Sequence, residues 1–174
     1  MPSIAERLGV PRYEADEHYR QALLAYQKKQ FDQAFDRLSR AIDLLPRHAE
    51  YYAARGFICL ERGARAEAEA DFEAALRLHP FEMLAHYGRG VLAYRDGNWE
   101  DAVTFFTRAL AADPERPETL YYLALAHHRQ RSHALALGYM RQALERFDKA
   151  GDKRRADAAR WVRELERLAS PQPG

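Results

Sequence analysis

The feature that most constrains this chain is a set of small residues that recurs at a constant interval of 34 positions. Three series hold only alanine or glycine: Ala22, Gly56, Gly90 and Ala124; Ala34, Ala68, Ala102 and Ala136; Ala41, Ala75, Ala109 and Ala143. A fourth series, of larger residues, lies beside them: Leu38, Phe72, Phe106 and Met140. Two helices approach closely only where neither carries a bulky side chain, and larger neighbours then fill the remaining space. The interval therefore predicts one helical unit that is used several times.

Residues 83–116 give the clearest copy of that unit. The first half predicts a helix over about Leu84–Arg95, and Gly97 then supplies the positive φ that ends it. The second half predicts a helix over about Trp99–Ala111. Pro114 stops this helix, because the residue before a proline is displaced from the helical region.

This 34-residue pattern resembles the tetratricopeptide repeat, a stacked helix–turn–helix unit. The resemblance covers Ala15–Ala150 in four copies, and Arg55-Gly56 and Arg89-Gly90 resemble a variant of the family's Leu-Gly pair. It implies an all-α fold, an α-solenoid in which stacked antiparallel helix pairs form a right-handed superhelix. The alternative is a generic alanine-rich helical bundle, which would not keep a constant period.

The expected organisation follows from this period. The four repeats are assigned to residues 15–48, 49–82, 83–116 and 117–150, after an extension at 1–14 and before a capping helix at 151–169 and a disordered tail at 170–174. Within the extension, a short helix over Ile4–Leu8 is expected to end at Gly9 and Pro11. In the fourth repeat Arg131 replaces the turn glycine.

The end of the chain is expected to close the array. The second helix of repeat four should begin after Ser132 and run on towards Gly151, and Asp152 should cap the last helix. Apolar residues then recur at helical spacing to form a stripe: Ala158, Trp161, Val162, Leu165, Leu168 and Ala169. This stripe is expected to cover repeat four. The arginines of the same helix leave contact with nucleic acid open as an alternative, although acidic residues are interleaved with them.

Composition excludes several classes of function. Of 174 residues 47% are hydrophobic and 30% are charged, and the net charge of +1 argues against a dominant nucleic-acid or membrane field. No apolar run has the length of a membrane span, the first ten residues lack a signal core, and we expect a cytoplasmic protein. The single cysteine, Cys59, is expected to be a small buried thiol.

In the family that the chain resembles, the first helix of each repeat lines a concave groove. The candidate groove residues are Tyr19, Leu23, Tyr26, Phe57, Tyr87, Val91, Tyr94, Tyr121, Leu125 and His128. Where the family often has asparagine, all four repeats carry an apolar residue. The sequence therefore predicts an interaction scaffold that binds an apolar helix or extended peptide of another protein. Alternatively, some of these residues pack between adjacent first helices.

Other functions have weaker support. No histidine pair has the spacing of a helical zinc site, no phosphate-binding glycine loop is present, and we expect no enzyme activity, cofactor or metal. The positions at which one family subclass clamps a C-terminal carboxylate hold no basic residue, so we expect no such recognition. Self-association into a homo-oligomer through the groove or the Trp161 helix stays as the alternative function.

Overall fold

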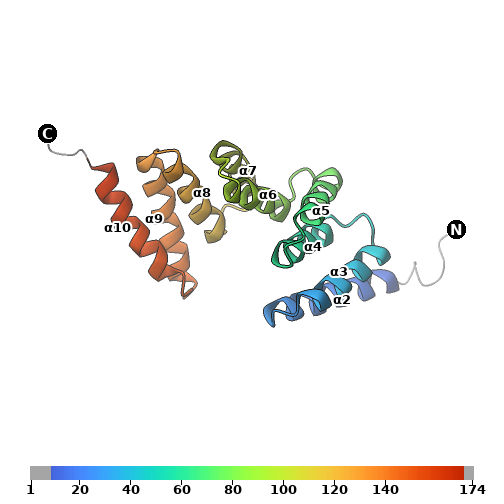
Figure 1. Ribbon diagram of the computed structural model, residues 1–174. Helices are drawn as coiled ribbons and strands as arrows, with labels where there is room; N and C mark the ends of the chain where they lie inside the picture. Colours follow the sequence, from blue (N-terminus) through green and yellow to red (C-terminus); the bar gives the residue numbers. More distant parts are fainter. Residues whose placement is uncertain (1–8, 171–174) are drawn as a thin grey trace. The chain divides into compact units, whose positions relative to one another are not determined.

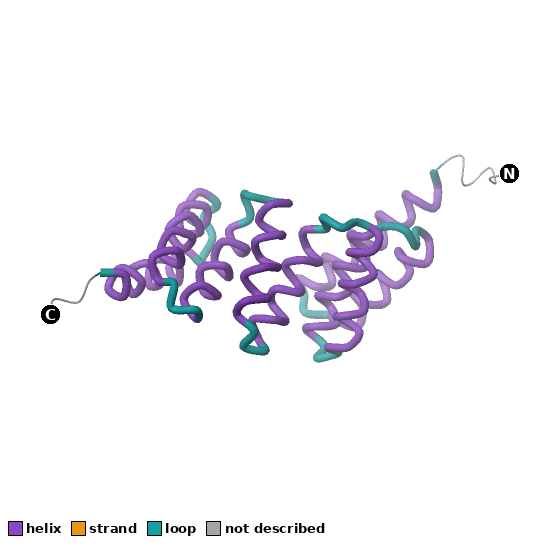
Figure 2. The backbone as a smooth tube through the Cα atoms, turned by 90° about the horizontal axis from the view of Figure 1, so that it is seen from above, coloured by secondary structure: helices purple, strands orange, loops and turns teal. Residues whose placement is uncertain are grey.

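The computed structural model describes residues 9–170, and within this range the regular structure is entirely helical (Figures 1 and 2). The helices are α2 (Val10–Gln27), α3 (Phe31–Leu44), α4 (Ala49–Glu61), α5 (Arg65–Leu78), α6 (Met83–Arg95), α7 (Trp99–Ala112), α8 (Pro117–Arg129), α9 (His133–Lys149) and α10 (Arg155–Ala169). The start points reproduce the sequence period: α4, α6 and α8 begin 34 residues apart, as do α3, α5, α7 and α9.

The chain divides into two compact units, and the division falls within α6, between Gly88 and Arg89. In the first unit α2 packs on α3, α3 on α4, and α4 on α5. In the second unit α7 packs on α8, α8 on α9, and α9 on α10, and the last three helices lie side by side (Figure 1). Each unit is thus built from helical hairpins joined by short turns.

The small-residue series marks places where two helices meet closely. A Cβ atom at Gly90 would lie 2.6 Å from the Phe106 ring, and a Cβ atom at Gly56 would lie 2.6 Å from the Phe72 ring. In the first and fourth copies the residue opposite is smaller or more flexible, and alanine takes the place of glycine. The four pairs are Ala22 with Leu38, Gly56 with Phe72, Gly90 with Phe106, and Ala124 with Met140. Glycine thus occurs in the two copies whose partner is phenylalanine.

The arginine before each of these glycines is held in a different way. Arg55 donates from Nε and Nη2 to the two carboxylate oxygens of Asp71, each at 2.8 Å, and Asp71 is only 6% exposed. One repeat later Phe105 replaces the aspartate, and the guanidinium of Arg89 lies 5.0 Å from the centre of that ring. The arginine at this repeat position is therefore held by a carboxylate in one copy and by an aromatic face in the next.

The turns within the hairpins share one backbone conformation. Gly63 and Gly97 have φ of 75° and 76°. Lys29 and Arg131, at the same position in the first and fourth copies, have φ of 59° and 64°. The left-handed conformation is therefore kept where the sequence offers no glycine.

The start of the described chain differs from expectation. Pro11 was expected to end a helix, but it lies in the first turn of α2, which begins at Val10. Proline is tolerated there because its missing N–H would have no partner within the helix. The expected helix over Ile4–Leu8 lies outside the described residues.

At the end of the described chain α10 packs on α9, and two details differ from the expected capping helix. Ala158 and Leu165 of α10 are fully buried in a cluster with residues of α8 and α9. Asp152 does not cap the helix directly: it accepts from the Arg154 N–H at 2.8 Å, and α10 begins one residue later. Leu168 and Ala169 are exposed, because the helix extends past the residues that it covers. The expected tail, apart from Ser170, lies outside the described residues.

Candidate peptide-binding groove

In the first unit, three predicted groove residues share one face of α2. Tyr19, Leu23 and Tyr26 are spaced by four and three residues, which places them on the same side of the helix. Leu23 is 42% and Tyr26 is 39% exposed, whereas Tyr19 is half-buried. The hydroxyl of Tyr19 donates to Glu50 at 2.7 Å, and burial together with this acceptor raises its pKa. This face offers accessible apolar area beside one fixed, neutral phenol.

The second repeat contributes stacked rings to the same unit. Phe57 stacks on Tyr87 with 5.7 Å between ring centres, and it forms a T-shaped contact with Phe72 at 5.3 Å. Phe57 is half-buried, and Tyr87 is only 8% exposed. Tyr87 therefore supports Phe57 and offers little surface itself.

In the second unit, the corresponding face of α8 is partly covered by the last helix. Tyr121, Leu125 and His128 repeat the spacing seen on α2. Trp161 of α10 lies against them: its ring centre is 5.2 Å from that of His128, and it packs on the same hydrophobic cluster as Tyr121. Leu125, at 9% exposure, is buried in the cluster that includes Trp161. The chain's own last helix thus occupies part of the predicted groove in repeat four.

Tyr94 belongs to an aromatic cluster of the second unit. Its ring contacts Trp99 at 5.1 Å and Tyr122 at 5.9 Å, measured between ring centres. Arg129 lies over Trp99 at 5.6 Å and donates from Nε to the Tyr94 hydroxyl at 3.4 Å. This cluster combines flat apolar area with a cation and a hydroxyl.

The structure corrects the extent of the predicted groove. Tyr87, Val91 and Leu125 are buried, at 8%, 7% and 9% exposure, so three of the ten candidates present almost no surface to a partner. The series at the family's asparagine position is therefore apolar throughout but open only at Leu23 and, in part, at Phe57. The alternative that some of these residues pack between helices applies to the buried three.

Sequence reasoning missed two members of this surface. Trp161 was assigned to the stripe that covers repeat four, and His133 was given no role. The period carried a signal for His133, since it occupies the place of Phe31 and Trp99, whose rings pack beside Tyr26 and Tyr94. No sequence pattern indicated that Trp161 reaches His128.

The charges of α10 do not form a basic surface. Three of its four arginines, and Arg154 just before it, pair with neighbouring carboxylates: Arg154 with Asp152 and Glu118, Arg155 with Asp148, Arg160 with Asp157, and Arg167 with Glu164. Such pairing leaves little net field to attract a phosphate backbone. The nucleic-acid alternative therefore gains no support from this helix.

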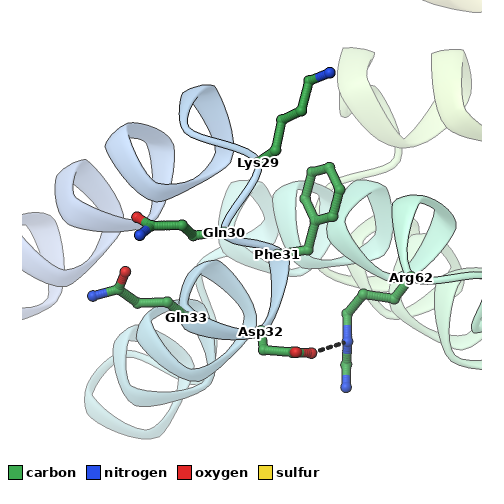
Figure 3. Close-up of a pocket in the computed structure, with 6 residues that line it drawn as sticks. All are labelled: Lys29, Gln30, Phe31, Asp32, Gln33 and Arg62. Atoms are coloured by element: carbon green, nitrogen blue, oxygen red, sulfur yellow. Dashed lines mark ion pairs between the residues drawn. The ribbon is translucent and has the colours of Figure 1, made fainter.

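A hollow of about 680 Å³ lies beside the turn between α2 and α3 (Figure 3). Asp32 at its edge pairs with Arg62 at 2.9 Å. Gln30 and Gln33 point to one side of the turn, and Lys29 and Phe31 to the other (Figure 3). Because these groups do not converge, the hollow does not resemble a site for a small ligand.

The thiol of Cys59, the single cysteine of the chain, is not in a form suited to nucleophilic chemistry. Cys59 has no exposed surface, and burial raises the pKa of its thiol to about 11. A nucleophilic cysteine requires the opposite shift. No helix within residues 9–170 combines the length and the apolar composition that a membrane span requires.

Comparison with known proteins identifies the architecture. Residues 60–117 and 98–152 match the family model of the tetratricopeptide repeat, and together they cover more than half of the 174 residues. Human DnaJ homolog subfamily C member 7 is 31% identical over 100 residues, which are 58% of this chain. The chain spans only 20% of that relative's length.

Solved structures show the same fold at lower identity. Pseudomonas aeruginosa PilF matches with a TM-score of 0.69 and 18% identity over 94% of this chain and 79% of that one. The first such domain of Spaghetti (RPAP3), solved with an HSP90 peptide, matches with a TM-score of 0.58 and 20% identity, covering 67% of this chain and 92% of that one. These matches place the fold among α-solenoids of helix pairs, and together with the family match they support a protein–protein interaction module.

Proposed function

Because the chain belongs to the tetratricopeptide repeat family, we propose that it binds a peptide or helix of another protein through the apolar face of its first helices. The observation that carries this proposal is the exposure of Leu23 and Tyr26 on α2, next to half-buried Tyr19. Large apolar side chains grouped on one helix face are a frequent mark of an interaction site.

The proposed contact is apolar and not electrostatic. The Spaghetti domain was solved with an HSP90 peptide, but the positions that would clamp a carboxylate carry no basic residue in this chain. Full burial of a side chain such as leucine contributes about 1.5–3 kcal/mol. After the costs of association, a few such contacts give an affinity in the micromolar range.

The test uses a phage-displayed random peptide library, because the partner is unidentified. We expect enriched peptides to carry aromatic or aliphatic residues at helical or alternating spacing. Synthetic versions should bind the parent protein, and Leu23→Glu or Tyr26→Glu should weaken binding by more than about tenfold, since each places a charge against an apolar ligand.

The matched control is Leu135→Glu. Leu135 is 56% exposed on α9, the second helix of its repeat, so the same change in charge there should leave peptide binding unchanged. Circular dichroism must match the parent for all three variants. Equal binding by Leu23→Glu, Tyr26→Glu and the parent would reject the proposal, and light scattering over a dilution series would then test self-association. Val91 is unsuitable for this test because it is buried.

A further inference from the structure

Two histidines face each other across the turn between α8 and α9. His128 lies one residue before the end of α8, and His133 is the first residue of α9. Their Nδ1 atoms are 3.4 Å apart, and their ring centres are 5.3 Å apart. We propose that His128 and His133 together bind one divalent transition-metal ion, such as Zn²⁺, through their Nδ1 atoms.

The repeat itself shows that this pairing is built into the fold. The same two positions hold Tyr26 and Phe31 in the first copy, with ring centres 5.9 Å apart. They hold Tyr94 and Trp99 in the third copy, at 5.1 Å. The architecture therefore brings two rings together at this turn, and in the fourth copy both rings are imidazoles. The second copy differs, because it holds Leu60 and Arg65 at these positions. The aromatic packing of the first and third copies is thus replaced in the fourth copy by two imidazole rings.

The distance suits a shared ion better than a direct hydrogen bond. Hydrogen bonds from N–H groups are usually about 2.7–3.2 Å long between heavy atoms, so 3.4 Å is a poor bond. Two nitrogens that each lie about 2.0–2.1 Å from one tetrahedral ion are separated by about 3.4 Å. An ion could thus join the two rings without moving either helix.

Neutral imidazole is the form that binds metals. The guanidinium of Arg129 is turned towards Tyr94 and Trp99.

The protein supplies two ligands, and the other coordination positions are left to water. Within residues 9–170, no group of three or more metal-binding side chains comes together, so His128 and His133 act as a pair. Imidazole ligands suit Zn²⁺, Cu²⁺ and Ni²⁺. This proposal revises the expectation from sequence that the chain holds no metal site, because that expectation considered only pairs on one helix face.

The experiment is titration of the full-length protein with Zn²⁺ by isothermal calorimetry. We expect one ion per chain with micromolar affinity. The double variant His128→Tyr/His133→Phe installs the ring pair of the first repeat, so it keeps the packing while removing both ligands. Its Zn²⁺ affinity should fall by more than tenfold, since loss of even an outer-shell partner weakens metal binding by about 10–100-fold.

Two further measurements distinguish metal binding at His128 and His133 from metal binding elsewhere on the protein. His127→Gln changes the adjacent histidine, which stacks on Tyr139 outside the pair, and should bind Zn²⁺ as the parent does. In a Trp99→Phe background, where Trp161 is the remaining tryptophan, Cu²⁺ should quench its fluorescence, because the Trp161 ring lies 5.2 Å from that of His128. No Zn²⁺ binding by the parent, or equal binding by the double variant, would overturn the proposal.

Discussion

At the scale of single residues, the turns keep a left-handed backbone conformation even where the sequence has no glycine. The four turns within the repeats each have a left-handed residue, and two of them have glycine there. Lys29 and Arg131 adopt this conformation although a side chain makes it unfavourable, by roughly 1–2 kcal/mol. The packing of the two flanking helices must therefore stabilise Lys29 and Arg131 in this left-handed conformation.

Replacing Lys29 and Arg131 by glycine should therefore stabilise the protein. We expect about 0.5–1 kcal/mol for each substitution, because the relief of backbone strain exceeds the entropy that glycine adds to the unfolded chain. Urea unfolding followed by circular dichroism measures the change. Gly63→Ala, which has open space for a Cβ atom but a φ of 75°, is the control and should destabilise. A loss of stability in both glycine variants would contradict this account.

At the scale of helix pairs, volume is matched within each copy. Glycine on the first helix goes with phenylalanine on the second, and alanine goes with leucine or methionine. The reason is the 2.6 Å separation between a Cβ atom at Gly90 and the Phe106 ring, which leaves no room for a methyl group. The pairing of residue sizes in the sequence and the Cβ–ring distance in the structure thus reflect the same limit on the space between the two helices.

This matching of side-chain volumes predicts that a second substitution restores stability lost through the first. Gly90→Ala alone should destabilise by about 1–3 kcal/mol, because the core is overpacked. Adding Phe106→Met, which copies the pair Ala124 and Met140, should recover part of that loss. A double-mutant cycle measured by chemical unfolding gives the coupling. If the two effects simply add, the proposed steric pairing is wrong.

At the scale of the whole molecule, the last helix does more than end the chain. Leu165 and Ala158 are fully buried against the cluster that contains Met140 and Phe147, and Trp161 of the same helix lies beside His128. One helix therefore covers the end of repeat four with two residues and alters the predicted groove with a third.

Removing residues 151–174 should expose Met140 and Phe147, lower the melting temperature and promote aggregation. A smaller change tests the same contact: Leu165→Ala should cost about 2–4 kcal/mol. Leu168→Ala, at a position that is 37% exposed on the same helix, should cost less than about 1 kcal/mol. Differential scanning calorimetry compares the melting temperatures of the truncated protein and the two variants with that of the parent. Equal melting temperatures for the truncated and parent proteins would show that α10 is not a cap.

The groove was predictable only in part, and particular residues show why. The period located Leu23 and Tyr26 on the first helix, and both are exposed. It could not distinguish Leu23 from Leu125, which stands at the same position three copies later and is buried by α10. Identical local patterns differ in exposure because exposure depends on what packs above them.

The sequence by itself determined the repeated helix pair, because small residues at a constant interval favour close-packed helices, and glycine or proline follows most of them. It also determined where the turns fall, even where Lys29 and Arg131 replace glycine. Only the tertiary structure decided which apolar residues stay open and brought His128, His133 and Trp161 together. These three belong to α8, α9 and α10, and contacts between separate helices depend on how the helices pack, which no local period encodes.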